Sequence, residues 1–171
     1  MFTKLFRIEG PWQGQLAVSA RPRGGDWLEE ELHGWRGEGI DVIVSLLVPE
    51  EVDDLDLLHE KACSETSGIE FLSFPITDRD IPARGADIHH FLGEIDLRLN
   101  QGKSVVIHCR QGVGRAGLIV SALLIERGLK AESAIQRVSA ARGVPIPETR
   151  EQRLWIDSFA AALMANPTAA S

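Results

Sequence analysis

Cys63 and Cys109 are the two cysteines of the 171-residue chain, and Cys109 stands in a segment suited to chemistry. An apolar run ends at Cys109, Gly112 and Gly114 follow, and an apolar helical stretch begins at Arg115. A short glycine-bearing loop that leads into a helix N-terminus turns successive backbone N–H groups toward one point, which makes a cradle for an anion. Arg115 would add a planar guanidinium that pairs with two phosphate oxygens. We expect the same positive field to favour the thiolate form of Cys109.

This segment resembles the His-Cys-x5-Arg signature of the cysteine-dependent protein phosphatases, in which Ser or Thr usually follows the arginine. Within that superfamily the chain is most similar to compact dual-specificity phosphatases, especially the cyclin-dependent-kinase-associated phosphatase group and its bacterial relatives. Residues 74–82 are similar to the acid loop of that group, where an aspartate precedes a proline by four residues, as Asp78 precedes Pro82. Residues 134–152 resemble the helix and following loop near the family's C-terminus, so the resemblance covers roughly residues 40–160.

The resemblance implies a role for each part of the segment. Cys109 would attack phosphorus and form a cysteinyl-phosphate intermediate, Arg115 would hold the phosphoryl oxygens, and Asp78 would act as general acid and then as general base. His108 and Gln152 would support these groups, and neither a metal nor another cofactor is implied. The residues that would bind the phosphate are Arg110, Gln111, Gly112, Val113, Gly114, Arg115 and Ala116.

Three positions depart from the family pattern or leave it open. Asp80 is the alternative to Asp78 as general acid, and the spacing to the proline favours Asp78. Ala116 replaces the Ser or Thr whose hydroxyl bonds the cysteine sulfur, which predicts slower breakdown of the intermediate. Glu148 stands where many relatives carry a water-positioning glutamine, and no role is assigned to it.

The resulting prediction is an enzyme, a protein phosphatase that hydrolyses phosphotyrosine in proteins or peptides, with phosphoserine and phosphothreonine left open. One alternative keeps the chemistry and changes the substrate to a phosphoinositide, a nucleotide or an RNA 5′-phosphate. Another is a phosphoprotein-binding pseudo-phosphatase, which only Ala116 favours because Cys109, Arg115 and Asp78 are all present. The formal net charge of -7 argues against nucleic acid as a partner.

Strands alternate with helices along the chain, which predicts an α/β fold with a mostly parallel sheet of about four or five strands, covered by helices on both faces. The predicted strands are residues 16–19, 41–47, 69–75 and 103–107, and the predicted helices are 28–35, capped by Asp26, then 49–62, 88–99, 116–127, 131–142 and one capped by Thr149 with Gln152. Ligands bind beyond the carboxyl ends of the strands in such sheets, which places the loops after residues 74 and 107 at one edge. Residues 1–171 are expected to form one phosphatase domain, in which residues 1–25 have no assigned role and residues 165–171 are a frayed tail.

Two cysteines are too few for a disulfide framework or a four-cysteine metal site, and they fit a reducing compartment. No apolar run has the length of a signal peptide core or a membrane span, so we expect a cytoplasmic protein that does not insert into membranes. Cys63 ends a helical apolar stripe and is interpreted as a packing residue. The alternative is a redox partner of Cys109.

Overall fold

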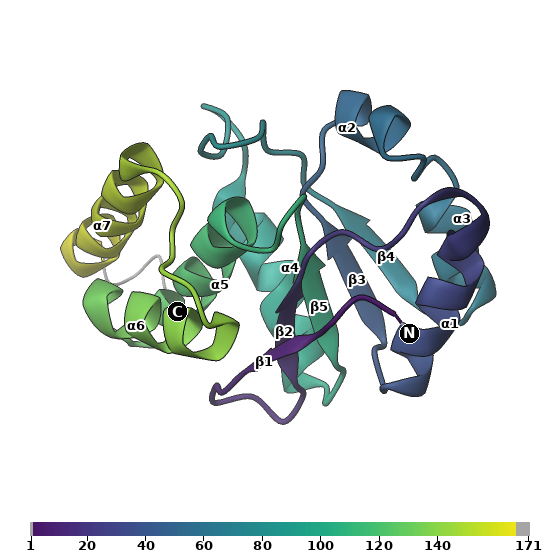
Figure 1. The fold of residues 1–171 in the computed structure, drawn as a ribbon. Coiled ribbons are helices and arrows are strands. Elements are labelled where there is room, and N and C mark those ends of the chain that lie inside the picture. The colour runs from purple at the N-terminus through teal and green to yellow at the C-terminus, as the bar shows by residue number, and fades with distance from the viewer. Residues whose placement is uncertain (1, 167–171) are drawn as a thin grey trace.

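A five-stranded sheet with the strand order β1-β2-β5-β3-β4 forms the centre of the computed structural model, which describes residues 2–166 (Figure 1). The strands are β1 (Phe6–Ile8), β2 (Leu16–Ser19), β3 (Val42–Ser45), β4 (Glu70–Ser73) and β5 (Val105–His108). Strands β2, β5, β3 and β4 are parallel, and β1 pairs antiparallel with β2 at one edge. The predicted α/β fold with a mostly parallel sheet is confirmed. Strand β1 was not predicted, because three residues are too few to show an alternating pattern.

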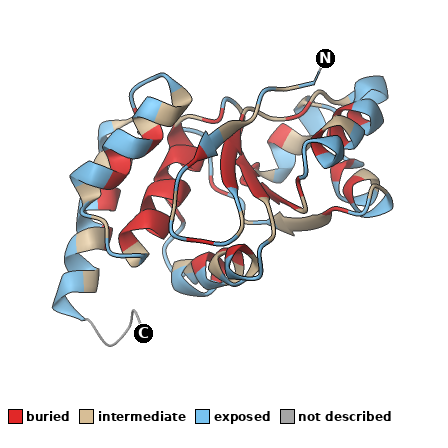
Figure 2. Ribbon diagram, turned by 90° about the horizontal axis from the view of Figure 1, so that it is seen from below, coloured by how far each residue is buried: buried red, intermediate tan, exposed pale blue. Residues whose placement is uncertain are grey.

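Helices cover both faces of the sheet (Figures 1 and 2). The helices are α1 (Leu28–Gly37), α2 (Pro49–Asp54), α3 (Glu60–Thr66), α4 (Ile88–Asn100), α5 (Gly114–Glu126), α6 (Ala131–Arg142) and α7 (Arg150–Ala165). Since successive strand residues point to opposite faces, Val105 and Ile107 join the core under α4–α7, whereas Val106 joins the core under α1 and α3. The strands are therefore apolar on both faces, as expected for a parallel sheet between two helical layers.

Helix α5 lies at the centre of the larger layer, and every one of its residues except Glu126 is buried. A Cβ atom on Gly117 would lie 2.3 Å from Cγ2 of Ile146, so a glycine is needed for the loop before α7 to approach α5. Thr149 caps α7 through the predicted reciprocal bonds with Gln152. This packing brings the C-terminal loop to the carboxyl edge of the sheet.

Two local predictions were wrong. Asp26 does not cap a helix: it lies within a 3-10 turn (Gly25–Trp27), and α1 follows from Leu28 without a side-chain cap. The helix predicted over residues 49–62 is two helices, α2 and α3. Asp56 between them has a positive φ of 56°, and its carbonyl accepts a hydrogen bond of 2.9 Å from the Gly25 N–H. The break buries Leu57 and leaves Leu58 64% exposed, so the core position moves by one residue.

Helix α7 ends at Ala165, and the rest of the expected frayed tail beyond Asn166 lies outside the described residues. The first 25 residues contain β1 and β2, so this segment forms part of the sheet. Between residues 2 and 166 no helix has the length and apolar character needed to cross a bilayer.

Candidate active site

The loop between β5 and α5 leaves the carboxyl edge of the sheet and curls around a small pocket. Cys109 is its first residue and is 3% exposed. Gly112 has a φ of 70°, and a Cβ atom there would lie 2.4 Å from the backbone of Ser19 in β2, so only glycine fits. From the other side, the Arg142 guanidinium donates to the carbonyls of Gln111 and Gly112 at 3.0 and 3.2 Å. Contacts from β2 and α6 thus help to shape the loop.

The pocket encloses about 280 Å³ of empty space, part of it open to solvent. It is lined by Asp78, Cys109, Arg110, Gln111, Gly114, Arg115 and Glu148. The structure therefore brings together the three predicted catalytic residues, although 31 positions (109 − 78) separate Asp78 from Cys109. Helix α5 begins at Gly114, slightly before the predicted start, which puts Arg115 in its first turn and Ala116, fully buried, just behind the pocket.

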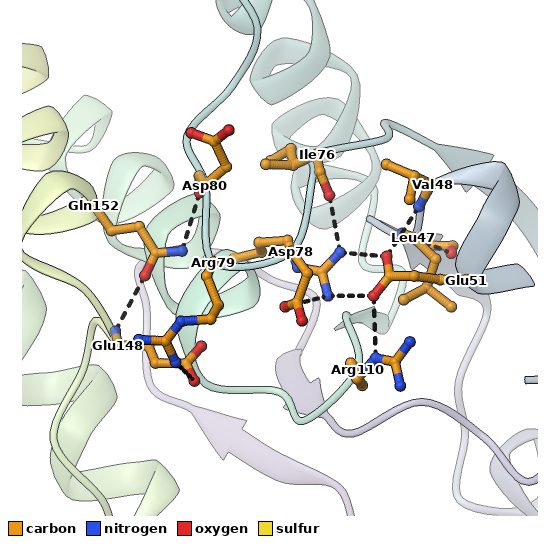
Figure 3. A network of polar contacts seen from close by, with 12 residues as sticks. Leu47, Val48, Glu51, Ile76, Asp78, Arg79, Asp80, Arg110, Glu148 and Gln152 are labelled. Atoms are coloured by element: carbon orange, nitrogen blue, oxygen red, sulfur yellow. Dashed lines mark hydrogen bonds and ion pairs between the residues drawn. The ribbon is translucent and has the colours of Figure 1, made fainter. Parts of the chain in front are cut away.

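Arg115 is 1% exposed, and its guanidinium is held by Glu51, Ile76 and Asp78, which are labelled in Figure 3. Its two terminal nitrogens donate to the two carboxylate oxygens of Glu51 at 2.6 and 2.9 Å. One of them also donates to the Ile76 carbonyl at 2.8 Å, and the other donates to the Asp78 carboxylate at 2.9 Å. These four bonds use all four N–H groups of the terminal nitrogens, and no acceptor within residues 2–166 bonds the Nε–H.

Glu51 was not predicted as a site residue. It also accepts hydrogen bonds from the Val48 backbone N–H and from Arg110 Nε, both at 3.2 Å. A sequence signal for it exists: Pro49 opens α2 directly after β3, and Glu51 is the third helical residue, where a glutamate reaches back to the helix start. Because β3 ends at the same edge of the sheet as β5, the start of α2 lies near the pocket.

The charges of this pair stabilise each other. Burial on its own would raise the pKa of Glu51, but hydrogen bonds from Arg115, Val48 and Arg110, with the positive charge of Arg115, hold it below its usual value. Burial likewise would lower the pKa of Arg115, but the Glu51 hydrogen bond and the charges of Cys109, Glu51 and Asp78 raise it. A charged guanidinium thus lines the same pocket as Cys109.

The segment that carries Asp78 is more open. The Asp78 side chain is 46% exposed and points at Arg115. Asp80, the alternative acid, does not line the pocket, and its carboxylate instead accepts a hydrogen bond of 2.8 Å from the Ile81 backbone N–H. This local bond is typical of a turn residue. The geometry favours Asp78 over Asp80, and its role as acid stays a prediction.

Two side chains tie this acid loop to the loop before α7 (Figure 3). Arg79, with a φ of 61°, pairs with Glu148 at 2.7 Å. Buried Gln152 donates its amide N–H to the Asp80 carbonyl at 3.0 Å and accepts from the backbone N–H groups of Glu148 and Thr149. Gln152 therefore supports the acid loop from behind, and Glu148 lines the pocket and holds Arg79.

Two predicted or alternative partners of Cys109 lie elsewhere. The His108 side chain projects to the opposite face of the sheet, near Trp35 of α1. Cys63 packs in the core under α1 and α3, whereas Cys109 belongs to the core under α4–α7, and both thiols are free. The sheet separates the two cysteines, which agrees with packing as the role of Cys63. Over residues 2–166 no cluster of three or more His, Cys, Asp or Glu could hold a metal ion.

A family model described as "Polymorphic toxin system, DSP-PTPase phosphatase" matches residues 18–129. This range is more than half of the chain and contains Glu51, Asp78 and the whole loop from Cys109 to Arg115. The chain belongs to this DSP-PTPase family. The resemblance to compact dual-specificity phosphatases is thereby confirmed. Glu148 and Gln152 lie beyond the match, so the geometry alone links them to the pocket of this DSP-PTPase.

Curated relatives extend the same family relationship. Bovine protein tyrosine phosphatase type IVA 3 is 33% identical over 89 residues, which are 51% of this chain and 51% of that protein. An Arabidopsis thaliana protein named phosphatidylinositol 3,4,5-trisphosphate 3-phosphatase and protein-tyrosine-phosphatase PTEN1 is 35% identical over 92 residues, 49% of this chain and 22% of that protein. The chain thus spans about half the length of the type IVA relatives, and less of the plant protein.

Solved structures resemble the DSP-PTPase chain over nearly its full length. Kinase associated phosphatase, solved with its catalytic cysteine changed to serine, superposes with a TM-score of 0.84 at 19% identity, covering 96% of this chain and 97% of that chain. The active form of Tk-PTP gives a TM-score of 0.74 at 28% identity, covering 92% of this chain and 96% of that chain. The first of these similarities supports the fold alone.

Proposed function

We propose that the protein is a phosphatase that hydrolyses phosphotyrosine in proteins, and phosphoserine and phosphothreonine as well, through a cysteinyl-phosphate intermediate. The observation that carries this proposal is the convergence of Cys109, Arg115 and Asp78 on one pocket at the N-terminus of buried helix α5. Membership of the DSP-PTPase family supports it.

In the first step the Cys109 thiolate attacks phosphorus, and the bond from phosphorus to the ester oxygen breaks. Asp78 gives its proton to the departing oxygen. In the second step water attacks the cysteinyl phosphate, Asp78 takes a proton from that water, and the S–P bond breaks to return the thiolate and inorganic phosphate. The loop amides, the helix N-terminus and Arg115 stabilise the charge on the phosphoryl oxygens in both steps.

The bonds around Arg115 suggest how the acid is released. One terminal nitrogen of the guanidinium donates to Asp78, and within residues 2–166 the Nε–H has no acceptor. A phosphate bound by two parallel N–H groups would use the Nε–H and the terminal nitrogen now bonded to Asp78. The incoming phosphate therefore displaces the Asp78 carboxyl from Arg115, and the displaced group is free to meet the leaving oxygen. Glu51 keeps the other edge of the guanidinium fixed during this exchange.

The test is hydrolysis of p-nitrophenyl phosphate and of phosphotyrosine and phosphoserine peptides, with a chelator present, by the wild-type chain and by Cys109→Ser. Cys63→Ser is the matched control, since that thiol lies across the sheet. We expect turnover by the wild type and Cys63→Ser and none by Cys109→Ser. Peptide binding without turnover by any of the three would overturn the proposal in favour of a phosphoprotein-binding role.

A phosphoinositide panel belongs in the same experiment. The plant relative is named as a phosphatidylinositol phosphatase, and one structural neighbour, PTPMT1, was solved with PI(5)P. In this chain Glu148 and Asp78 place two carboxylates beside Arg110 and Arg115 at the pocket, which disfavours a headgroup with several phosphates. Faster hydrolysis of phosphoinositides than of phosphotyrosine peptides would contradict the protein-substrate proposal.

A further inference from the structure

A histidine–glutamate pair is buried on the face of the sheet opposite the pocket. His108 is the last residue of β5 and fully buried, and Glu60 is the first residue of α3 and 2% exposed. His108 Nε2 lies 2.6 Å from Oε1 of Glu60, although 48 positions separate the two residues. The mechanism proposed above does not use this pair.

The His108 ring has Glu60 as its side-chain hydrogen-bond partner. Trp35 of α1 lies 6.3 Å away, centroid to centroid, and the residues beside His108 in the sheet are Ser19 of β2 and Ser45 of β3. Within residues 2–166, Glu60 is the titratable side chain that bonds the ring. The other ring nitrogen, Nδ1, is buried and has no hydrogen-bond partner among residues 2–166.

A carboxylate can only accept hydrogen bonds, so it requires His108 to carry a proton on Nε2. The opposite tautomer would set two lone pairs against each other at 2.6 Å. A buried polar atom that loses its partner costs free energy, so the ring has one favoured orientation while Glu60 is in place. The backbone at this point is equally fixed, because the His108 carbonyl accepts a 3.0 Å hydrogen bond from the Leu46 N–H.

We infer that Glu60 is a positioning residue for Cys109, acting through the ring of His108. Cys109 directly follows His108. The orientation of the ring and of the strand end therefore fixes where the chain leaves β5 and enters the phosphate loop, residues 109–115. This inference rests on the proposed function only where it predicts an effect of Glu60 on turnover. The tautomer of His108 and the reactivity of the Cys109 thiol are independent of any substrate.

The test compares Glu60→Gln with the wild type. Glutamine keeps the size of the side chain but can donate as well as accept, so it releases the constraint on the tautomer. We expect kcat to fall by about tenfold while KM changes little, since the amides and Arg115 that bind phosphate are untouched. The rate of Cys109 alkylation by iodoacetamide should fall in parallel. Thermal melting would show whether the variant is folded.

The matched control is Glu126→Gln, which removes the carboxylate from the exposed pair of His89 and Glu126 at 3.0 Å. This substitution should change neither kcat nor alkylation. Equal alkylation rates in wild type and in folded Glu60→Gln would overturn the inference, even if the wild type proves to have no phosphatase activity. Absent turnover with an altered alkylation rate would instead count against the proposed function alone.

A spectroscopic measurement covers the case in which Glu60→Gln does not fold. The 15N resonances of the His108 ring in the wild-type protein report which nitrogen carries the proton, and His108→Gln identifies them among the five histidines. We expect a proton on Nε2. A proton on Nδ1 alone, with Nε2 accepting from a protonated Glu60, would refute the assignment.

Discussion

The two loops that line the pocket are held in place by different means. The phosphate loop, from Cys109 to Arg115, is fixed by the core: Arg115 is 1% exposed and bonded to buried Glu51, and Gly112 lies against β2. The acid loop leaves the Asp78 side chain 46% exposed. Arg115 bonds its Ile76 carbonyl and the Asp78 carboxylate, and Glu148 and Gln152 add one contact each. The nucleophile and guanidinium therefore share the stability of the fold, whereas the acid depends on contacts that break at little cost. Substitutions that disturb the phosphate loop should change stability and activity together, and those that disturb the acid loop should change activity alone.

The largest effect is expected from Glu51→Ala. This variant leaves the buried Arg115 guanidinium without its bidentate partner, and breaking a buried ion pair from one side costs about 3–5 kcal/mol. Turnover should fall with stability, by about 10²-fold or more, because the guanidinium is no longer aimed at the phosphate. Urea denaturation gives the free energy of unfolding, and p-nitrophenyl phosphate gives kcat/KM.

The neighbouring exposed Glu50 supplies the control, since Glu50→Ala removes the same charge from the first turn of α2 without touching Arg115. Equal losses of stability in the two variants would show that helix charge, and not the buried pair, is what Glu51 contributes.

The same carboxylate should shape the response to acid. The folded-state pKa of Glu51 is depressed by Arg115, so its contribution to stability is complete above the unfolded value of about 4.3 and disappears as the pH falls through the lower, folded value. Asp41 and Glu70 also have lowered pKa values and contribute in the same direction. We expect the stability difference between wild type and Glu51→Gln, measured by denaturation, to shrink as the pH is lowered from 6 to about 3. A difference independent of pH over this range would contradict the ion-pair account.

Gly112→Ala tests the contact between the phosphate loop and β2. The added Cβ would lie 2.4 Å from the Ser19 carbonyl and would also occupy a φ of 70°. Gly143→Ala is the control for φ alone, because Gly143 ends α6 at a φ of 82° with nothing within 4 Å of its Cβ position. We expect Gly112→Ala to lose about 1–3 kcal/mol more stability than Gly143→Ala and to lose activity, whereas the control stays active. Similar losses in both would mean that the loop can move away from β2.

Ala116→Ser adds a group to the phosphate loop. A hydroxyl at this buried position in the first turn of α5 would donate to the Cys109 sulfur as it leaves phosphorus. A hydrogen bond to a charged atom contributes about 1.5–3 kcal/mol, so breakdown of the cysteinyl phosphate should become at least about tenfold faster. Rapid-quench kinetics separate the burst from the steady state, and Ala122→Ser, also buried but six residues further along α5, is the control. An unchanged steady-state rate after the burst would refute the role assigned to this position.

Much of the fold followed from local pattern. The buried strands are short continuous apolar runs, α4 has a clear helical period, and the loop after β5 carries its glycines and arginine within seven positions, so these features need no long-range information. The break between α2 and α3 was not visible, because it depends on the Asp56 carbonyl meeting the Gly25 N–H from a distant segment. The apolar spacing of residues 52–62 alone fits one helix equally well.

The site residues also divide into those that a local motif reveals and those that only the fold brings together. Cys109 and Arg115 belong to one motif, and Asp78 has a spacing to Pro82 that marks it. Glu51 lies in α2 and Glu148 in the loop before α7, and their positions after Pro49 and in the C-terminal motif do not reveal that they pair with Arg115 and Arg79. Their contact with the arginines arises only when the carboxyl ends of the strands and the start of α7 meet at one edge.

The smallest effect on stability is expected from the contact across the pocket mouth. Arg79 and Glu148 form an ion pair with side chains 61% and 29% exposed, and such pairs contribute about 1 kcal/mol or less. Arg79→Ala should therefore leave the free energy of unfolding nearly unchanged. It should still lower kcat severalfold, because an acid loop released from Glu148 spends less time with Asp78 over the pocket.

A double-mutant cycle with Glu148→Ala separates this contact from other effects of each residue, since the two single variants and the double variant should then lose kcat to a similar extent. The control is Arg153→Ala, which removes exposed pairs with Glu132 of α6 and Asp157 of α7, away from the acid loop. A loss of stability in Arg79→Ala as large as that in Glu51→Ala would show that the acid loop is part of the core structure. Additive losses of kcat in the cycle would show that Arg79 acts on substrate directly. We predict that the two substitutions lower kcat in a coupled way and leave stability unchanged. This result requires that the acid loop is attached separately from the rigid phosphate loop.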